Sequence, residues 1–421
     1  MKNTSLEREI SVGIIGLGAM GKGLLYQTTI TPNIHAAAVC DTDLDKACCI
    51  LREFNLAYQV VETEDDLARA VAAHVVAVFR DGEQLARIPC LDAVIESTGT
   101  IIPGARFSIA ALEAKKHLIL MNSEVDLIFG PYLCRLARQN GVVCTSCDGD
   151  QYGVLKHLID DIRQWGFTLV MAGNIKGFLD RTATPNSIVA EADKRNLDYK
   201  ACASYTDGTK LNIEMAITAN AFGLKTKRTG MHGPACDTID ELHDTFNFST
   251  LWQDKEPFVD YVLGAKPGGG VFIVGYCEHP YQQQMLQYYK MGDGPFYTFY
   301  RPYHLCHIES MACVEEAVLR HQALMTPDYG FVTNVYAYAK RDLQAGETLD
   351  GIGGEACYGL IENCDEQGDS PGIPICLADQ VRLKKSVPKG EKILLQDVDY
   401  DPQRLDFQLF ALANEREDKS C

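Results

Sequence analysis

The segment Ile10–Ile15 has the pattern of a buried strand, and apolar residues at helical spacing follow it after a short break. The same succession of an apolar strand and a helical segment recurs along the first 150 residues. Further strands are expected within 35–43, 91–100, 115–126 and 142–150. Because strands and helices that alternate at this spacing build parallel sheets, residues 1–150 are predicted to form a doubly wound α/β domain.

The first strand runs directly into a GxGxxG motif, which lies between a strand and a helix as the Rossmann fold requires. In that fold the first glycine permits a tight turn, the second lets a pyrophosphate approach the backbone, and the third allows close helix packing. The N–H groups of the following helix then face the phosphates. We therefore expect NADH or NADPH to be bound by Gly16, Gly18, Ala19, Met20 and Gly21.

The second strand ends in Asp41, twenty residues after Gly21. A carboxylate at this place bonds the ribose hydroxyls of NAD and repels the 2′-phosphate of NADP. Asp41 alone thus favours NAD, but Lys46 is close in sequence, and an aspartate that caps the next helix is the alternative.

Polar residues follow the later strands at their carboxyl ends, where ligands bind in sheets of this kind. We expect Ser97, Thr98 and Gly99 to contact the cofactor. Asn122, Glu124 and Asp150 are expected to face the nicotinamide or the substrate. For Asp148 and Asp150 the alternative is a polar turn before the next helix.

In the middle of the chain, residues 151–328, the strict alternation fades and an α+β substrate domain is expected. After Thr209 the sequence predicts a helix that ends at Gly223, with Asp207 near its N-cap. Lys210 and Glu214 fall on one face of that helix. The alternative is a solvated helix surface, although a lysine in the first turn opposes the helix dipole.

We expect this region to carry the chemistry. Lys210, with Lys176 at the end of a preceding strand, would stabilise a developing alkoxide, and Asp207 or Glu214 would relay a proton. Arg301 and His304, between an aromatic strand and a helix from about Leu305, would hold the anionic end of a substrate. A structural, hydrogen-bonded histidine is the alternative for His304.

Residues 329–421 carry little helix signal and contain a weak repeat, "KRDLQAGE" and "KSVPKGE". The repeat resembles the β-clip unit of SAF domains, so a small, mostly β domain is expected there. The three domains are thus predicted at 1–150, 151–328 and 329–421.

Composition narrows the class of partner. The 421 residues carry a net charge of −18, which disfavours nucleic acids and anionic membranes, and no stretch of 18 apolar residues occurs. The amino-terminal segment lacks an export pattern, so the 16 cysteines are expected to be reduced and the protein cytoplasmic. "CTSC" (144–147) is interpreted as a pair of structural thiols.

The order of motifs resembles a known family. "GLGAMG", "VIESTG", "HLILMNSEVD", "DGTKLNIEMA", "NAFGL" and "YRPYHL", followed by an SAF-like tail, are similar to the reductoisomerase-like DRL enzymes. The resemblance implies NADPH-dependent conversion of 1-deoxy-D-xylulose 5-phosphate to 2-C-methyl-D-erythritol 4-phosphate, in a family whose members vary in substrate. The amino-terminal motifs are also similar to those of homoserine dehydrogenases.

The sequence leaves three alternative functions for this protein. The first is an NAD(P)H-dependent reductase or reductoisomerase of a small, phosphorylated hydroxy-carbonyl compound. The others are a plain dehydrogenase of the homoserine type and a non-catalytic protein that responds to nucleotides. A homodimer is expected. A divalent metal is weakly indicated, with Glu124, Asp148 and Asp150 as the available carboxylates, and no metal ligand is assigned.

Overall fold

The computed structural model describes residues 8–195 and 197–415, so the amino-terminal residues 1–7 that were searched for an export pattern lie outside it. Contacts group the chain into two compact units. Unit 1 comprises the chain up to Asp150, residues Leu305–Thr326 and the chain from Gln408 onward, and unit 2 comprises Gln151–His304 and Pro327–Phe407. The three consecutive domains expected from the sequence remain a proposal.

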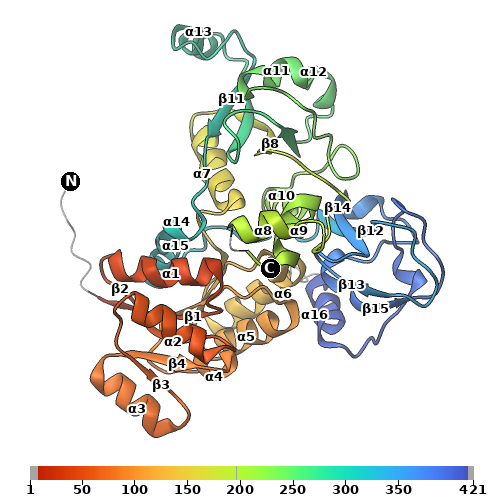
Figure 1. Cartoon of the computed structure of the whole chain (residues 1–421). Helices are drawn as coiled ribbons and strands as arrows, with labels where there is room; N and C mark the ends of the chain where they lie inside the picture. The colour runs from red at the N-terminus through yellow and green to blue at the C-terminus, as the bar shows by residue number, and fades with distance from the viewer. Residues whose placement is uncertain (1–7, 196, 416–421) are drawn as a thin grey trace. The chain divides into compact units, whose positions relative to one another are not determined.

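Unit 1 contains a seven-stranded parallel sheet with the order β3-β4-β2-β1-β5-β6-β7, flanked by helices (Figure 1). This confirms the doubly wound α/β fold. Its strands are β1 (Ile10–Ile15), β2 (Ile34–Cys40), β3 (Tyr58–Val60), β4 (Val76–Phe79), β5 (Ala93–Glu96), β6 (His117–Leu120) and β7 (Cys144–Ser146). Its helices are α1 (Ala19–Ile30), α2 (Leu44–Glu53), α3 (Glu64–Ala73), α4 (Gly82–Ala86), α5 (Ile101–Glu113), α6 (Ser123–Asn140), α14 (Cys306–Glu309) and α15 (Met311–Arg320).

The core of unit 1 explains why its strands are almost wholly apolar. Both faces of the sheet are covered, so β1 and β5 are buried along nearly their whole length. Residues from α15, including Met311 and Val314, belong to the same apolar cluster as Ile14 and Ile95. A segment some 300 positions along the chain thus completes the Rossmann core.

Unit 2 contains a four-stranded mixed sheet with the order β11-β10-β8-β9. Its elements before residue 305 are α7 (Gln151–Gln164), β8 (Thr168–Lys176), α8 (Val189–Arg195), α9 (Tyr199–Asp207), α10 (Thr209–Phe222), η1 (Ile239–Glu241), α11 (Leu242–Thr245), α12 (Phe248–Leu251), β9 (Phe258–Leu263), β10 (Val271–Tyr276), α13 (Pro280–Tyr288) and β11 (Phe296–Arg301). The glycine-rich stretch 268–270 joins β9 to β10, which lie on opposite sides of β8, so it is no hairpin. Gly270 is needed there because a Cβ would lie 2.4 Å from the Arg301 carbonyl oxygen.

The tail of the chain is mostly β, as expected. It contains β12 (Thr333–Ala339), β13 (Thr348–Asp350), β14 (Cys357–Asn363), η2 (Cys364–Glu366), η3 (Ile375–Leu377), β15 (Asp379–Leu383), η4 (Leu395–Asp397), β16 (Val398–Asp399) and a closing helix α16 (Leu405–Asn414). β12 pairs with β14, and β13, β15 and β16 form a second small sheet.

The β12–β14 pair is joined to α10 within unit 2. The N–H of Gly359 donates to Thr209 Oγ1 at 2.8 Å, and the N–H of Ile361 donates to Asn212 Oδ1 at 2.9 Å. Two polar side chains of α10 therefore satisfy backbone groups of β14. Among the helices of the described chain, none is long and apolar enough to cross a lipid bilayer.

Candidate active site

The glycine loop has the geometry that the motif predicts. Gly16 is left-handed, with φ of +92°, and a Cβ on it would lie 2.9 Å from the N–H nitrogen of Thr98. A Cβ on Gly21 would lie 1.7 Å from the Gly16 carbonyl oxygen, whereas a Cβ on Gly18 would meet nothing within 4 Å. Gly18 is the N-cap of α1, and Ala19 and Met20 open the helix. The second glycine therefore leaves open space before a helix N-terminus, which suits a pyrophosphate.

Asp41 follows β2 and fastens the glycine loop. Its Oδ2 accepts the N–H of Leu17 at 2.9 Å and lies 3.0 Å from Lys46 Nζ, while Oδ1 accepts the N–H of Asp43 at 3.0 Å. Burial would raise the pKa of Asp41, but the contacts with Asp43, Lys46 and Leu17 outweigh it, so the pKa is lowered. The helix-capping alternative is wrong, because Asp43 caps α2. The role of Asp41 in the choice between NAD and NADP stays a prediction.

The rim after β5 contains a buried acid that the sequence did not single out. Ser97 Oγ donates to the Gly16 carbonyl oxygen at 2.8 Å, and Thr98 donates to Glu96 Oε1 through its N–H at 2.8 Å and through its hydroxyl. Glu96 is fully buried. Burial raises its pKa to about 7, against the hydrogen bonds from Thr98. Gly99 has open space at its Cβ position. Thr98, one of the expected cofactor contacts, is thus held by a carboxyl group whose pKa lies near neutral pH.

The residues expected to face the substrate are one asparagine that caps a helix and several acidic residues near the starts of helices. Asn122 caps α6 by accepting the N–H of Val125, and its amide donates to the Thr100 carbonyl at 3.0 Å, so it joins two loops of the rim. Glu124 lies in the first turn of α6. Asp148 accepts the N–H of Gly149 at 2.7 Å, and Asp150 Oδ1 lies 3.8 Å from Cys306 Sγ. Asp148 and Asp150 are buried and lie in a turn directly before α7, as the alternative of a polar turn before the helix expected.

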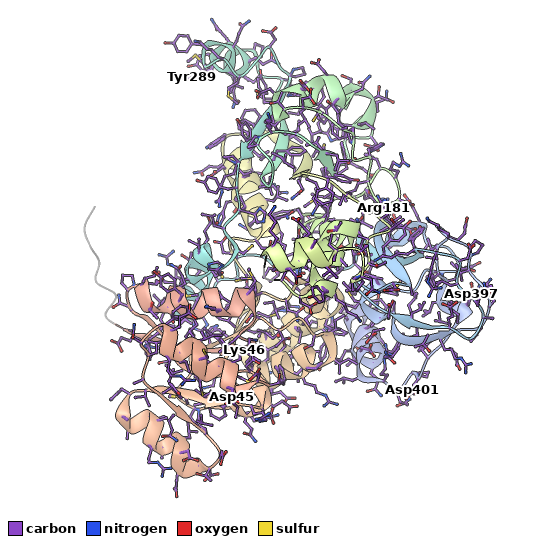
Figure 2. All side chains as sticks on the ribbon, in the orientation of Figure 1. Asp45, Lys46, Arg181, Tyr289, Asp397 and Asp401 are labelled. Atoms are coloured by element: carbon purple, nitrogen blue, oxygen red, sulfur yellow. The ribbon has the colours of Figure 1, made fainter. Side chains whose placement is uncertain are left out.

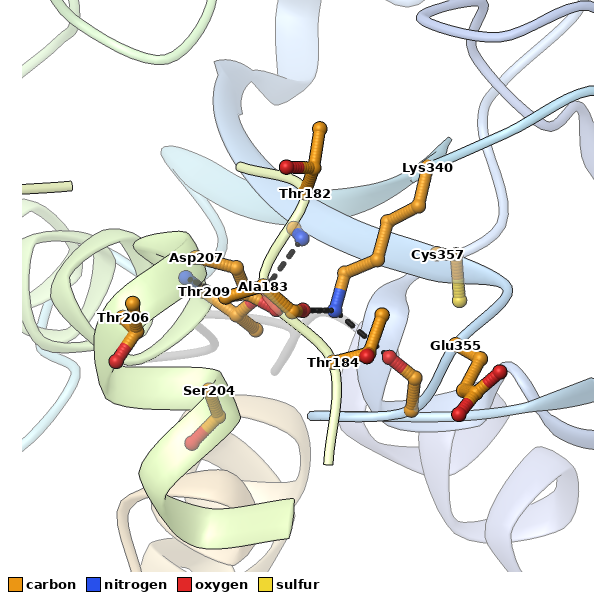
Figure 3. A network of polar contacts seen from close by, with 12 residues as sticks. Thr182, Ala183, Thr184, Ser204, Thr206, Asp207, Thr209, Lys340, Glu355 and Cys357 are labelled. Atoms are coloured by element: carbon orange, nitrogen blue, oxygen red, sulfur yellow. Dashed lines mark hydrogen bonds and ion pairs between the residues drawn. The ribbon is translucent and has the colours of Figure 1, made fainter. Parts of the chain in front are cut away.

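In unit 2 the turn between α9 and α10 is built around a buried ion pair (Figure 3). Asp207 ends α9, and its Oδ1 accepts the N–H of Thr209 at 2.8 Å, so it does support the start of α10. Its Oδ2 lies 2.8 Å from Nζ of Lys340, just after β12, and neither side chain is more than 2% exposed. Lys340 also donates to the carbonyls of Ala183 and Gly354, at 2.6 and 2.7 Å. Burial raises the pKa of Asp207, against the charge and hydrogen bond of Lys340.

The predicted helix is present as α10, and Gly223 ends it in the left-handed conformation. Every residue of α10 is buried except Lys210, which is partly exposed. The alternative of a solvated surface helix is therefore wrong. Glu214 is 4% exposed and shares the Lys210 face. A lysine at the open end of a buried polar face can act on a ligand, and this remains the prediction for it.

The residues expected to bind the substrate anion contact backbone carbonyl oxygens. Arg301, the last residue of β11, donates from Nε to the Tyr303 carbonyl at 3.0 Å and lies over the Tyr303 ring. His304 Nδ1 lies 2.8 Å from the Gly269 carbonyl oxygen. The structural alternative for His304 thus has a contact that supports it. Lys176 ends β8 and is partly exposed. Cys144 and Cys147 are both buried; the neighbouring Cys134 thiol and burial raise the pKa of Cys144, and burial raises the pKa of Cys147.

Three polar features of unit 2 were missed from the sequence. They are Lys340, the half-buried Arg181, and a contact of 2.7 Å between His232 Nδ1 and Asp260 Oδ2. Only Asp260 had a signal, because it is a charged residue within the apolar segment Phe258–Leu263 and such a charge needs a partner.

Comparison with known proteins gives one family match. Residues 149–310 match the family described as oxidoreductase DRL, catalytic domain. This part of the chain is therefore similar to an oxidoreductase catalytic domain, and it follows the sheet of unit 1, which has the glycine loop of a Rossmann fold.

Other similarities are distant. The chain is 27% identical to a homoserine dehydrogenase of Bacillus subtilis over 139 residues, which are 32% of this chain and 28% of that protein. It is 23% identical to a homoserine dehydrogenase of Synechocystis over 247 residues, 55% of this chain and 52% of that one, so it spans about half of that relative or less.

Solved structures have only low similarity to the chain. A probable dehydrogenase from Thermotoga maritima is 12% identical with a TM-score of 0.40, over 75% of this chain and 90% of that one. A DOX-P reductoisomerase in complex with magnesium is 17% identical with a TM-score of 0.36, over 49% of this chain and 56% of that one.

Proposed function

We propose that the protein is an NAD(P)H-dependent reductase or reductoisomerase of a small, phosphorylated hydroxy-carbonyl compound. The observation that carries the proposal is the DRL catalytic domain at residues 149–310, directly after a sheet whose glycine loop leaves open space at Gly18. The two homoserine dehydrogenases above give weaker support to a plain dehydrogenase as second candidate. Conversion of 1-deoxy-D-xylulose 5-phosphate is one substrate to test.

The cofactor would be held in unit 1. Gly16, Gly18, Ala19, Met20 and Gly21 would receive the pyrophosphate, and Ser97, Thr98 and Gly99 would line the rim beside it. Bound NAD(P)H would supply a hydride to the substrate carbonyl. Asp41 already accepts three donors, so whether it admits a ribose 2′-phosphate is open to test with both cofactors.

The substrate groups would be in unit 2. Lys210 would stabilise the alkoxide that forms at the carbonyl oxygen, with Lys176 as a second cation, and Glu214 would move the proton. The sequence also predicts Asp207 as a proton relay, as the alternative to Glu214. Since Asp207 is fully buried in an ion pair, we assign it the role of positioning the turn that leads to Lys210.

Glu124, Asp148 and Asp150 are the oxygen ligands that a divalent cation would use.

The decisive experiment is a turnover screen of the purified protein with NADPH and with NADH. The substrates would be 1-deoxy-D-xylulose 5-phosphate, other sugar phosphates and aspartate semialdehyde. A product with a rearranged carbon skeleton, seen by NMR, identifies a reductoisomerase, and an unrearranged alcohol identifies a plain reductase. Cofactor binding without turnover of any substrate would contradict the proposal and favour a nucleotide-responsive binding protein. A cytoplasmic location and a homodimer stay predictions.

A further inference from the structure

Arg181 is held by backbone contacts on both sides. It lies in the turn after β8, where Asp180 Oδ1 accepts the N–H of Thr182 at 2.9 Å and the N–H of Asp180 donates to the Thr206 carbonyl at 2.8 Å. On the other side, Lys340 binds the carbonyl of Ala183 at 2.6 Å (Figure 3). The turn is thus fastened to the end of α9 and to the end of β12. A side chain carried by such a turn starts from a fixed backbone, which is what a binding residue requires.

Among the described residues, none provides an anionic partner for the guanidinium of Arg181. Its central carbon lies 5.6 Å from the centroid of the Tyr358 ring, in β14, and Figure 2 shows Arg181 beside that part of the chain. Within residues 8–195 and 197–415, no carboxylate pairs with it, and its buried Nη1 has no hydrogen-bond acceptor. A buried N–H group without an acceptor is costly. The residue as a whole is nevertheless partly exposed.

Tyr261 connects Arg181 to the His232–Asp260 pair. Burial raises the pKa of Tyr261, while the positive charge of the neighbouring Arg181 guanidinium lowers it. The hydroxyl oxygen of Tyr261 also lies close to the backbone next to His232. A Cβ on Gly233 would be only 2.2 Å from that oxygen. Arg181, Tyr261 and His232 therefore follow one another along the β9 edge of unit 2.

The orientation of His232 is fixed by a fully buried carboxylate. Asp260 accepts the N–H groups of His232, Gly233 and Tyr261 at 3.0, 2.9 and 2.8 Å, and it lies 2.7 Å from His232 Nδ1. Because a carboxylate can only accept, Nδ1 donates to Asp260, and in the Nδ1–H tautomer Nε2 is the acceptor. The His232 side chain is 30% exposed. It can therefore accept a hydrogen bond from a ligand hydroxyl.

We infer that Arg181, Tyr261 and His232 form a binding site for a small molecule with an anionic group and an adjacent hydroxyl. Arg181 takes the carboxylate or phosphate, and His232 Nε2 accepts the hydroxyl. This inference rests on the proposed function in taking the ligand to be the anionic substrate. It assigns the anion to Arg181 in place of Arg301 and His304, which contact the carbonyl oxygens of Tyr303 and Gly269.

Direct binding tests the site without turnover, so its failure and that of the proposed reaction are distinguishable. Calorimetry on the full chain would use inorganic phosphate, malonate and tartronate, the last differing from malonate by one hydroxyl. We expect Arg181→Met to weaken binding of the preferred anion at least tenfold, and Arg301→Met to leave it within twofold. Phosphate and malonate separate a phosphorylated from a carboxylated ligand. No binding to the parent protein, or equal binding to Arg181→Met, overturns the inference.

The hydroxyl contact has its own test. We expect the parent protein to bind tartronate several-fold more tightly than malonate, and His232→Leu to lose that preference while still binding malonate. Because Arg181→Met could fold poorly, Arg181→Lys provides a second variant, which keeps the charge but loses the planar fork. Its affinity should lie between those of the parent and of Arg181→Met. An unchanged tartronate preference in His232→Leu would overturn the assignment of Nε2.

Discussion

Asp207 and Lys340 are 133 positions apart in sequence, yet Nζ of Lys340 lies 2.8 Å from Oδ2 of Asp207. The pair joins the end of α9 to the end of β12 and, through Ala183, to the turn that carries Arg181. It thus connects the tail of the chain to the part that matches the DRL catalytic domain. Both side chains are buried, so each charge depends on the other.

Breaking this pair should cost far more than breaking an exposed one. We expect Lys340→Met to lower the free energy of unfolding by about 3–5 kcal/mol, because it leaves a buried carboxylate without its counter-ion. The double variant Asp207→Asn with Lys340→Met should recover part of the loss. Urea unfolding of the purified variants measures both. The control is Arg341→Met, which removes the ion pair between the neighbouring Arg341 and Glu347. The two groups are 2.9 Å apart, and the Arg341 side chain is 52% exposed. This change should lower the free energy of unfolding by less than about 1 kcal/mol. Equal losses for Lys340→Met and Arg341→Met would contradict the prediction.

Glu96 should make unit 1 less stable as the pH rises. Since burial raises its pKa from 4.5 to about 7, the folded state binds more protons than the unfolded state between these values. Stability should therefore fall as the pH rises from about 4.5 to about 7 and stay level above that range. A shift of this size corresponds to about 3 kcal/mol.

Glu96→Gln should remove this dependence and stabilise the protein at pH 8. Asp126, buried and with a pKa also raised to about 7, contributes a parallel fall and is kept in both proteins. The measurement is urea unfolding without cofactor at pH 5, 6, 7 and 8. The difference between variant and parent should grow with pH, and a constant difference would disprove the shift.

The fold of unit 1 could be predicted because its signals are local. The strand Ile10–Ile15, the glycine loop and the helix after it are adjacent in sequence, and the structure has each of them at the expected place. Long-range polar partners left no such signal. Nothing around Lys340 shows that its ammonium reaches Asp207, and Arg181 has no neighbour in sequence that points to Tyr358. The short strands β3 and β4 were missed because they have few residues to form a pattern.

The two glycines of the loop should fail in different ways when changed to alanine. Gly21→Ala should destabilise the fold by several kcal/mol or prevent it, because the new Cβ would lie 1.7 Å from a backbone oxygen. Gly18→Ala should fold with nearly unchanged stability, since nothing lies within 4 Å of that Cβ. It should nevertheless bind NAD(P)H at least tenfold more weakly, because the methyl group takes the space of the pyrophosphate. Thermal unfolding and fluorescence titration with cofactor measure the two effects. Tight cofactor binding by Gly18→Ala would show that the pyrophosphate lies elsewhere.

Lys210 should affect the rate far more than cofactor binding. It is the partly exposed residue of an otherwise buried helix, in the matched catalytic domain, while the glycine loop belongs to unit 1. We expect Lys210→Met to lower kcat by about 10²–10³, the loss typical of removing one group that stabilises developing negative charge. The dissociation constant of NAD(P)H should change by less than about twofold. Lys200→Met, an exposed lysine on α9 that donates to the Asp350 carbonyl, is the matched control and should keep near-normal kcat. Steady-state kinetics with the best substrate of the screen, together with cofactor titration, decide the case. A Lys210→Met protein that turns over normally would remove Lys210 from the reaction and leave Lys176 as the remaining cation to test.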